Sequence, residues 1–479
     1  KLKQAGNGIV NANFSSFIGT NNSQNDSDLD LNNIRNNVSV NGTAGRFNYL
    51  VGFGNHYVNG LSAIKSANNE SDKFSKINTN VKLGYNFSKT LSIAAYFNHD
   101  KYSSGYDDSF YFADQNNVSK NEQLRFAISP KFKYNNGSIT INTAINDVKR
   151  AFESDYPATF KAKIFTIDAF NKYAFNDQIM TVIGVNIVDN QMENIDDFTN
   201  LTGDLANDQI IDPYANVTYI SDYGLQANAG VRLNNHSEYG SHLVYNINPS
   251  YVFKLKENHS LKLLSSYSTA YITPSLYQLF VPFYGNKDLK PQEDRTIEAG
   301  FEYNLDEKLR FSAIYFNRNQ DQFIDYVITD YTTYAGEYQN IDNAFEVNGL
   351  EVELSYKPFN RLTLDANYTF TEKKNDIIFR VPKQKVNANV NYQFCEKTSA
   401  NISYQFTGER TSTALDETFT NNRILDAYNL VNFSLNHKVL DNKMTLFASV
   451  TNLFNEDYEE LYNYTTLGRN YTLGFKLSL

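Results

Sequence analysis

The side chains able to do catalysis or bind metal are few here, and their spacing forms no reactive pattern. Six His are scattered through 479 residues, and Cys395 is the single Cys, which excludes an intrachain disulfide. His236 and His242 flank one predicted loop, but no Cys or Glu completes a zinc-binding pattern around them. No nucleophile elbow, phosphate-binding loop or catalytic pair of carboxylates stands out. The sequence therefore predicts that the protein is not an enzyme.

Aromatic residues are concentrated at residues 267–284. Pro282, Gly285 and Pro291 break the strand pattern in this region, which predicts a long structured loop. Two interpretations stay open for these rings: contact with a ligand, or a girdle of Tyr at a membrane interface. We favour the girdle for Tyr267 and Tyr271, which lie on the preceding predicted strand. For Tyr277, Phe283 and Tyr284, which lie in the loop, we expect contact with a ligand, and for Tyr277 and Tyr284 contact with a plug is the alternative.

The composition excludes several classes of protein. The net charge is −10, whereas binding of nucleic acid needs an excess of Lys and Arg. No run of about 20 apolar residues is present, so no transmembrane helix is predicted. Residues 1–8 lack an apolar core, so no signal peptide is predicted there. Tyr and Phe number 35 each, which favours strands, and a mean hydropathy of −0.50 is compatible with strands that are apolar on one face only.

Apolar and polar residues alternate with a period of two in many segments. The stretch "VNANVNYQF" at 386–394 places Val, Ala, Val, Tyr and Phe on one face, and Asn and Gln on the other. The stretches "INTNVKLGYNF" at 77–87 and "VNGLEVELSY" at 347–356 behave in the same way. Such alternation is typical of strands with one apolar and one wet face.

This pattern predicts about 22 strands, an even number, as bacterial single-chain barrels have. The predicted ranges are 9–19, 29–40, 46–55, 73–87, 90–102, 121–134, 138–152, 160–175, 178–190, 208–220, 224–233, 241–253, 259–271, 292–304, 308–322, 345–357, 361–372, 382–394, 398–410, 423–438, 443–454 and 467–479.

The predicted connections alternate between short turns and long polar loops. Short turns lie at 88–90, 135–137, 176–177, 221–224, 305–308, 358–361 and 440–442. Long loops lie at 56–72, 103–120, 191–207, 272–291, 323–344, 411–422 and 455–466. A soluble β-sandwich does not need this order, and a propeller would show a repeat of about 40–50 residues that is absent. The fold prediction is therefore all-β: an antiparallel transmembrane β-barrel of about 22 strands, of the outer-membrane type.

A barrel of this width is too wide for its side chains to fill, and transporters of about 22 strands have a plugged lumen. The predicted strands use essentially the whole chain, so we expect residues 1–479 to be one barrel domain without a plug. A plug would then lie upstream of Lys1, be a separate polypeptide, or be lost.

Two stretches resemble TonB-dependent outer-membrane receptors. Residues 273–303 contain a Pro-Ser-Leu-x-x-Leu segment, then Gly-Asn-x-x-Leu-Lys-Pro and Glu-x-Gly, which begin at Pro274, Gly285 and Glu298. Residues 449–479 contain Asn-Leu-Phe-Asn-x-x-Tyr and Gly-Arg-x-Tyr, which begin at Asn452 and Gly468. The last strand resembles a barrel-insertion signal, with Leu479 where Phe is usual, and we expect it to pair with residues 9–19 and close the barrel.

The resemblance implies energised uptake of a scarce, bulky nutrient across the bacterial outer membrane, which the chain crosses many times. Within this family, the residues around 275–295 and 462–474 look most like vitamin B12 (cobalamin) receptors. The implied partners are the TonB complex, reached through a plug domain, together with outer-membrane lipid and a corrinoid substrate. The alternatives are a ferric siderophore or haem receptor and, in another class, a plugless passive pore or scaffold.

Cobalamin receptors bind calcium through acidic early loops, so the resemblance also implies a metal site. Its candidate ligands are Glu70, Asp72, Asp107, Asp108 and Asp114. Calcium prefers several oxygen ligands, often carboxylates, that converge from loops. The chain departs from the family pattern two residues after Gly60, where Ser replaces an Asp. The alternative is that these carboxylates are simply solvated.

The composition, rich in Asn, Lys and Tyr, indicates an AT-rich genome of the Bacteroidetes type. Receptors of that kind often carry a surface lipoprotein lid, which we add to the expected partners.

Overall fold

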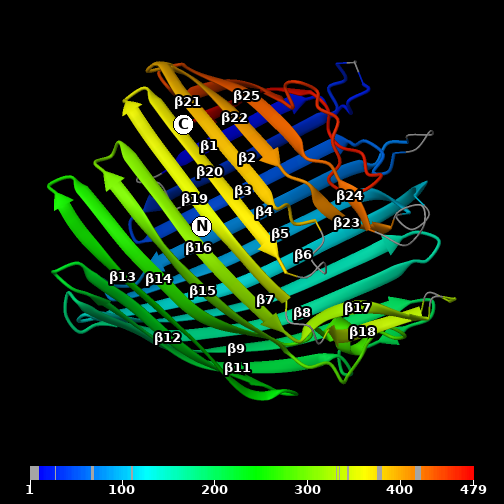
Figure 1. Cartoon of the computed structure of the whole chain (residues 1–479), viewed down its shortest axis with the longest axis horizontal. Helices are drawn as coiled ribbons and strands as arrows, with labels where there is room; N and C mark the ends of the chain where they lie inside the picture. Colours follow the sequence, from blue (N-terminus) through cyan, green and yellow to red (C-terminus); the bar gives the residue numbers. More distant parts are fainter. Residues whose placement is uncertain are drawn as a thin grey trace.

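The computed structural model describes residues 10–26, 29–65, 70–108, 112–330, 332–333, 335–341, 345–374, 380–415 and 422–479. Within these ranges, 22 strands form a closed antiparallel barrel (Figure 1), as the sequence predicts. They are β1 (Asn11–Gly19), β2 (Asn33–Ala44), β3 (Phe47–Asn59), β4 (Lys73–Asn86), β5 (Leu91–Asp108), β6 (Ala113–Tyr134), β7 (Gly137–Glu153), β8 (Ala158–Ala174), β9 (Ile179–Asp196), β11 (Asn207–Ile220), β12 (Leu225–His236), β13 (Gly240–Lys256), β14 (His259–Ile272), β15 (Gln292–Leu305), β16 (Leu309–Asp321), β19 (Phe345–Phe359), β20 (Leu362–Lys373), β21 (Gln384–Cys395), β22 (Thr398–Thr407), β25 (Tyr428–Val439), β26 (Met444–Thr451) and β27 (Asn470–Ser478).

The barrel closes where the two ends of the chain meet. Strand β27 pairs with β26 on one side and with β1 on the other, from Asn13 opposite Ser478 to Gly19 opposite Thr472. Strand β1 also pairs with β2, so the wall has no free edge at this seam. The predicted pairing of the last strand with the first is confirmed.

The period-two alternation separates a lipid-facing surface from the lumen. One row of paired residues runs across six strands with apolar side chains throughout: Val51, Val81, Phe97, Phe126, Ile145 and Phe165. The adjacent row carries Asn80, Asn98, Arg125 and Asn146, and the Asn98 Nδ2 donates to Asn80 Oδ1 at 2.5 Å. Lipid cannot hydrogen-bond, so the apolar row faces lipid and the amide row faces the lumen.

The two ends of the barrel differ, as Figure 1 shows, with tight turns at one end and long connections at the other. The turns use left-handed residues such as Gly45 (φ 60°) and Asn136 (φ 61°). The long connections contain further elements that the sequence did not predict. These are the hairpins β17 (Phe323–Asp330) with β18 (Ala335–Ile341) and β23 (Arg410–Leu415) with β24 (Asn422–Leu425), the two-residue β10 (Asn200–Leu201), and α1 (Leu276–Phe280). Most of β24 falls within the predicted strand 423–438, which the structure divides into β24 and β25. No helix in the described ranges is long and apolar enough to cross a membrane.

The prediction of a long loop at 103–120 is wrong. Strand β5 continues to Asp108 and β6 begins at Ala113, and the pair stays in register from Ser103 opposite Lys120 to Tyr106 opposite Asn117. This part of the hairpin lies beyond the apolar belt, where both faces are wet. The alternation therefore disappears from the sequence although the backbone ladder continues.

Buried apolar side chains lie mainly at the loop end of the barrel. In the described ranges they form two small cores, one with Met192, Leu201, Ala206 and Leu276, and the other with Leu279, Leu289 and Ile324. The second core joins the 273–291 connection to the β17–β18 hairpin. We call these two segments together the loop cap.

Candidate functional site

The loop cap begins with a short helix that the sequence specifies locally. The Ser275 hydroxyl accepts a hydrogen bond from the Gln278 backbone N–H at 3.3 Å, and the Gln278 side chain accepts one from the Ser275 backbone N–H at 2.9 Å. This capping box starts α1 immediately after Pro274. Leu276 and Leu279, both from the family motif, are 8% and 5% exposed and anchor the two cores.

Reciprocal hydrogen bonds fasten the second half of the motif to the hairpin. Asn286 Nδ2 donates to the Tyr338 carbonyl at 2.9 Å, and the Tyr338 N–H donates to the Tyr284 carbonyl at 3.0 Å. The Lys290 N–H donates to Asn340 Oδ1 at 2.8 Å, and Asn340 Nδ2 returns a bond to the Lys290 carbonyl. The loop cap is therefore a packed, hydrogen-bonded unit.

The three aromatic residues predicted to contact a ligand lie on this unit. Tyr277 is on α1 and its ring lies 6.2 Å from that of Tyr338, while Tyr284 lies 5.8 Å from Tyr326. Phe283 stands next to Tyr284, with a left-handed backbone (φ 70°) and a side chain that is 80% exposed. A left-handed backbone is unfavourable for a bulky residue, so the surrounding loop imposes this conformation on Phe283 while its ring stays exposed.

Tyr326 and Tyr338, whose rings lie 5.7 Å apart on the hairpin, were not among the residues predicted from the sequence. The run "FIDYVITD", rich in aromatic and β-branched residues, could have indicated β17. Tyr hydroxyls are protonated near neutral pH and can donate hydrogen bonds, and burial raises the pKa of both Tyr277 and Tyr338 further above its ordinary value.

The acidic residues predicted to hold calcium come from neighbouring loop-end segments. Asp107 is buried and accepts hydrogen bonds from the Ser62 hydroxyl (3.1 Å), the Ile64 N–H (2.9 Å) and the Gln115 N–H (3.0 Å). Ser62, the residue that departs from the family pattern, thus supplies a donor where the pattern has a carboxylate.

The other four acidic residues lie around the same loops. Asp72 accepts from the Ala63 N–H at 2.8 Å, and Asp114 accepts from the Glu70 N–H at 3.2 Å. Asp108 is the last residue of β5. Burial raises the pKa of Asp72 to about 6, against the hydrogen bond from Ala63, and the charges of Asp107, Glu70 and Asp114 add to the rise.

The acidic residues supply the charge that a calcium ion needs, but not an arranged set of ligands. No group of three His, Cys, Asp or Glu among the described residues is placed to hold a metal ion. Asp107 already accepts three hydrogen bonds, so its oxygens are engaged by the chain itself. Calcium at this site stays a prediction.

We expect Asp72→Asn to stabilise the 60–72 connection at pH 8 and to leave it unchanged at pH 4. A carboxyl whose pKa is raised on folding favours the native state below its unfolded pKa, and this advantage disappears as the pH rises through about 6. The Asn side chain keeps an acceptor for the Ala63 N–H but carries no charge. Hydrogen exchange of the Ala63 and Ile64 amides, measured without divalent cations, reports the change. Equal effects of the substitution at both pH values would contradict this account.

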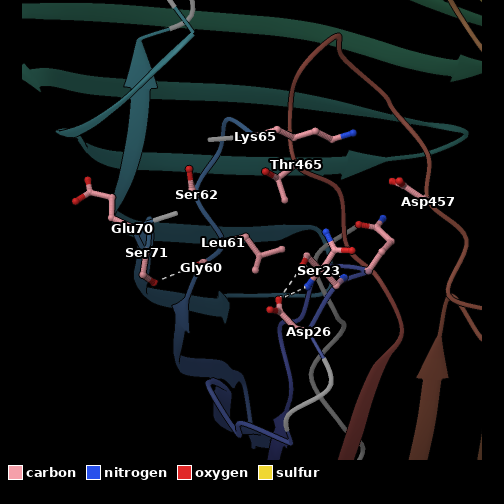
Figure 2. Close-up of a pocket in the computed structure, with 12 residues that line it drawn as sticks. Ser23, Asp26, Gly60, Leu61, Ser62, Lys65, Glu70, Ser71, Asp457 and Thr465 are labelled. Carbon is pink, nitrogen blue, oxygen red and sulfur yellow. Dashed lines mark hydrogen bonds between the residues drawn. The ribbon is translucent and has the colours of Figure 1, made fainter. Parts of the chain in front are cut away.

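A polar cavity of about 510 Å³ opens beside the acidic residues. Figure 2 shows that its lining comes from three connections far apart in sequence, which contribute Ser23 and Asp26, Ser62 and Glu70, and Asp457 and Thr465. Glu70 and Ser62 belong to both the cavity and the acidic neighbourhood. A hydrophilic part of a ligand could therefore reach these carboxylates from outside.

The carboxy-terminal motif is structural. Asn452 and Asn455 have left-handed backbones (φ 47° and 58°), a conformation that Asn tolerates. Asn452 Nδ2 donates to the carbonyls of Glu456 and Leu467, and Asn455 Nδ2 donates to the Gln24 carbonyl. These bonds fold the last loop back onto the first and hold one wall of the cavity.

Comparison with known proteins identifies the family. A model described as "TonB dependent receptor-like, beta-barrel" matches residues 11–453. The vitamin B12 transporter BtuB of Vibrio cholerae serotype O1 is 28% identical over 249 residues, which are 51% of this chain and 38% of that protein. The chain thus matches well under half the length of that relative.

Solved structures show the same architecture at low sequence identity. The siderophore receptor PirA from Acinetobacter baumannii superimposes with a TM-score of 0.80 at 14% identity, over all of this chain and 81% of PirA. The copper transporter OprC superimposes with a TM-score of 0.79 at 13% identity, over the same shares of the two chains. Together with the closed barrel of 22 strands, the family match shows that this chain belongs to the β-barrels of TonB-dependent receptors, which are proteins of the bacterial outer membrane.

Proposed function

We propose that this barrel belongs to a receptor that takes up a corrinoid, such as cobalamin, across the outer membrane with energy from TonB. The observation that carries the proposal is the match to a vitamin B12 transporter over half of the chain, in a barrel whose loop end carries a packed aromatic cap. We further propose Tyr277, Phe283 and Tyr284 as substrate contacts.

The proposed partners follow from the family. A plug domain, encoded upstream or as a separate chain, would fill the lumen and contact TonB. A surface lipoprotein would cover the loop end. Sequencing of the gene upstream of Lys1 tests the first of these: a plug with a TonB box supports active uptake. A signal peptide directly before β1 would instead favour the alternative of a passive pore or scaffold.

Calcium is proposed as an aid to substrate binding at the acidic residues. Crowding of Asp72, Asp107, Glu70 and Asp114 creates a negative potential that a divalent cation would relieve. The ligand affinity of the purified receptor should fall when a chelator is added and recover with calcium. An affinity that does not change with chelator would remove this proposal.

Ferric siderophores, haem and copper remain the alternative cargoes. The solved structures that resemble the chain include siderophore and copper receptors, but their identities of 13–14% support the fold alone. The cargo therefore has to be tested by uptake.

Deleting the gene should abolish growth on limiting cobalamin in a strain with no second cobalamin receptor. Uptake of labelled cyanocobalamin should also stop when an uncoupler collapses the proton gradient. Iron-limited growth of the same strain is the control, and it should be unaffected. Normal growth on limiting cobalamin, together with impaired growth on limiting iron, would favour the siderophore alternative.

A further inference from the structure

Aromatic rings form an unbroken series across the loop cap. Phe283 lies 6.5 Å from Tyr284, Tyr284 lies 5.8 Å from Tyr326, Tyr326 lies 5.7 Å from Tyr338, and Tyr338 lies 6.2 Å from Tyr277, measured between ring centroids. Every spacing is within the range of favourable aromatic contacts. The series joins the exposed tip of the 273–291 connection to α1, by way of the β17–β18 hairpin.

The series continues from α1 onto the wall of the barrel. Tyr277 lies 5.9 Å from Phe160 on β8, Phe160 lies 6.1 Å from Phe152 on β7, and Phe152 lies 5.9 Å from Tyr106 on β5. On β7 and β8 the odd-numbered residues, such as Ile145 and Phe165, face lipid. Phe152 and Phe160 are even-numbered, so their side chains are on the lumen face. We call these eight rings the aromatic track.

The rings of the track are not the hydrophobic core of the cap. That core is made by Leu279 and Leu289, which are 5% and 3% exposed. The track residues are half-buried, and Tyr284 and Phe283 at its outer end are 44% and 80% exposed. Two rings of the track, Tyr277 and Tyr338, pack against the two aliphatic cores and stay partly exposed, so part of each ring remains accessible to a solute.

We propose that the aromatic track is an entry path that captures a solute with a planar, conjugated ring at Phe283 and leads it to Tyr106 inside the barrel mouth. Neighbouring ring planes are inclined at 54–86°, so each ring packs edge-to-face or tilted against the next. A planar conjugated solute that passes along the track therefore meets ring faces and ring edges in turn, and both are favourable aromatic contacts. This inference rests on the proposed receptor function and adds the chemical class of its substrate.

Charges beside the track narrow that class further. Asp325 and Asp196 act electrostatically on the hydroxyls of Tyr338 and Tyr277. At the inner end, Asp107 follows Tyr106 in the chain. The Asp72 carboxylate lies close to the neighbouring Gly105, because a Cβ built on Gly105 would collide with it. Carboxylates therefore lie beside the part of the track on the loop cap and also beside its inner end at Tyr106.

Two positive charges offset them only in part. Lys287, in the loop cap, has its Nζ 5.0 Å from the centre of the Phe280 ring. Arg150 is the cross-strand partner of Phe160, and its Nε donates to Asn121 Oδ1 at 2.8 Å. Four carboxylates against these two cations leave a negative border, which repels anions and accepts neutral or cationic solutes. The substrate class is therefore a neutral or cationic planar-ring compound rather than an anionic ferric catecholate.

Equilibrium binding of three probes to the purified receptor tests the inference. The probes are cyanocobalamin, which is neutral with a planar macrocycle, haem, which is planar with two carboxylates, and anionic ferric enterobactin. We expect cyanocobalamin to bind at least about tenfold more tightly than either anion.

Variants of the track separate stacking from packing. Phe283→Leu and Tyr338→Leu should each weaken cyanocobalamin binding by about three- to tenfold, the range for one aromatic contact. Phe283→Trp should restore the affinity, and its fluorescence, the only Trp signal in a chain without Trp, should be quenched by the ligand. The matched control is Phe198→Leu. Phe198 is also an exposed aromatic residue, at 77%, and it lies in a connection outside the track. It should bind as the unmodified receptor does.

Two further variants test the effect of the carboxylates beside the track. Asp196→Asn and Asp325→Asn should raise the affinity for haem and leave that for cyanocobalamin within twofold. Two outcomes would overturn the inference separately. If cyanocobalamin binds but the Leu variants match the Phe198→Leu control, the track is wrong and the proposed function stands. If haem or ferric enterobactin binds best and the Leu variants weaken it, the corrinoid function and the charge argument fail while the track stands.

Discussion

A chain that lacks residues 470–479 should fail to assemble into a barrel. Strand β27 pairs over seven residues with β1 and over eight with β26, so its loss leaves two strand edges unpaired along the seam. In a bilayer, each unsatisfied backbone group costs several kcal/mol, because lipid offers no replacement hydrogen bond. The measurement is heat modifiability in gel electrophoresis, in which a folded barrel migrates differently before and after boiling.

A single methyl group at the seam tests the same idea without a deletion. At Gly474, an added Cβ would lie 2.5 Å from the Ser16 backbone oxygen across the seam and 2.4 Å from the Phe447 ring. Gly474→Ala should therefore destabilise the barrel by about 2 kcal/mol, as overpacking does. The matched control is Gly52→Ala on β3, where the nearest atoms lie at 3.8 Å and stability should not change. Equal unfolding midpoints in urea for the two variants, or a folded truncated chain, would contradict the argument.

The strands of the barrel wall were predictable because each residue in the membrane faces either lipid or the lumen, and this alone decides whether it is apolar or polar. Wherever β4 or β21 crosses the apolar belt, every second side chain must be apolar, and the alternation can be seen in the sequence. Beyond the belt this constraint ends. Both faces of β5 and β6 are wet at 103–108 and 113–120, so the sequence there resembled a loop while the backbone stayed paired. The β17–β18 hairpin was missed for a different reason: β17 carries aromatic and β-branched residues, but it lies within a connection predicted to be one long polar loop.

The candidate site was less predictable because it depends on contacts between distant segments. Tyr277 and Phe160 are neighbours only because α1 lies against the loop ends of β8 and β9, and no local pattern announces this. Asp107 looked like a free carboxylate in its loop, whereas the structure surrounds it with donors from Ser62, Ile64 and Gln115. The residue types showed which segments carry polar or aromatic side chains. The contacts of each side chain depend on how distant segments pack, so they could not be predicted.

The ion pair between Arg318 and Asp294 should show a strongly asymmetric response to mutation. Arg318 Nε and Nη2 donate to the two oxygens of Asp294 at 2.9 and 3.1 Å on the lumen face of β15 and β16. The Asp294 side chain is 4% exposed, whereas that of Arg318 is 46% exposed. Removing Arg318 leaves a buried carboxylate without compensation, at a cost of about 3 kcal/mol. Removing Asp294 leaves a guanidinium that water can still reach, so the cost should stay near 1 kcal/mol, roughly that of a lost hydrogen bond.

A double-mutant cycle measures this asymmetry. Arg318→Met should lower the free energy of unfolding in urea much more than Asp294→Asn does, and the double variant should recover most of the loss from Arg318→Met, because no buried charge remains. The pair Arg310 and Glu302 is the matched control, since both are inward-facing but the Glu302 side chain is 24% exposed. Arg310→Met should therefore cost less than Arg318→Met. Similar costs for the two Arg variants would mean that burial of the carboxylate does not govern the strength of these lumenal ion pairs.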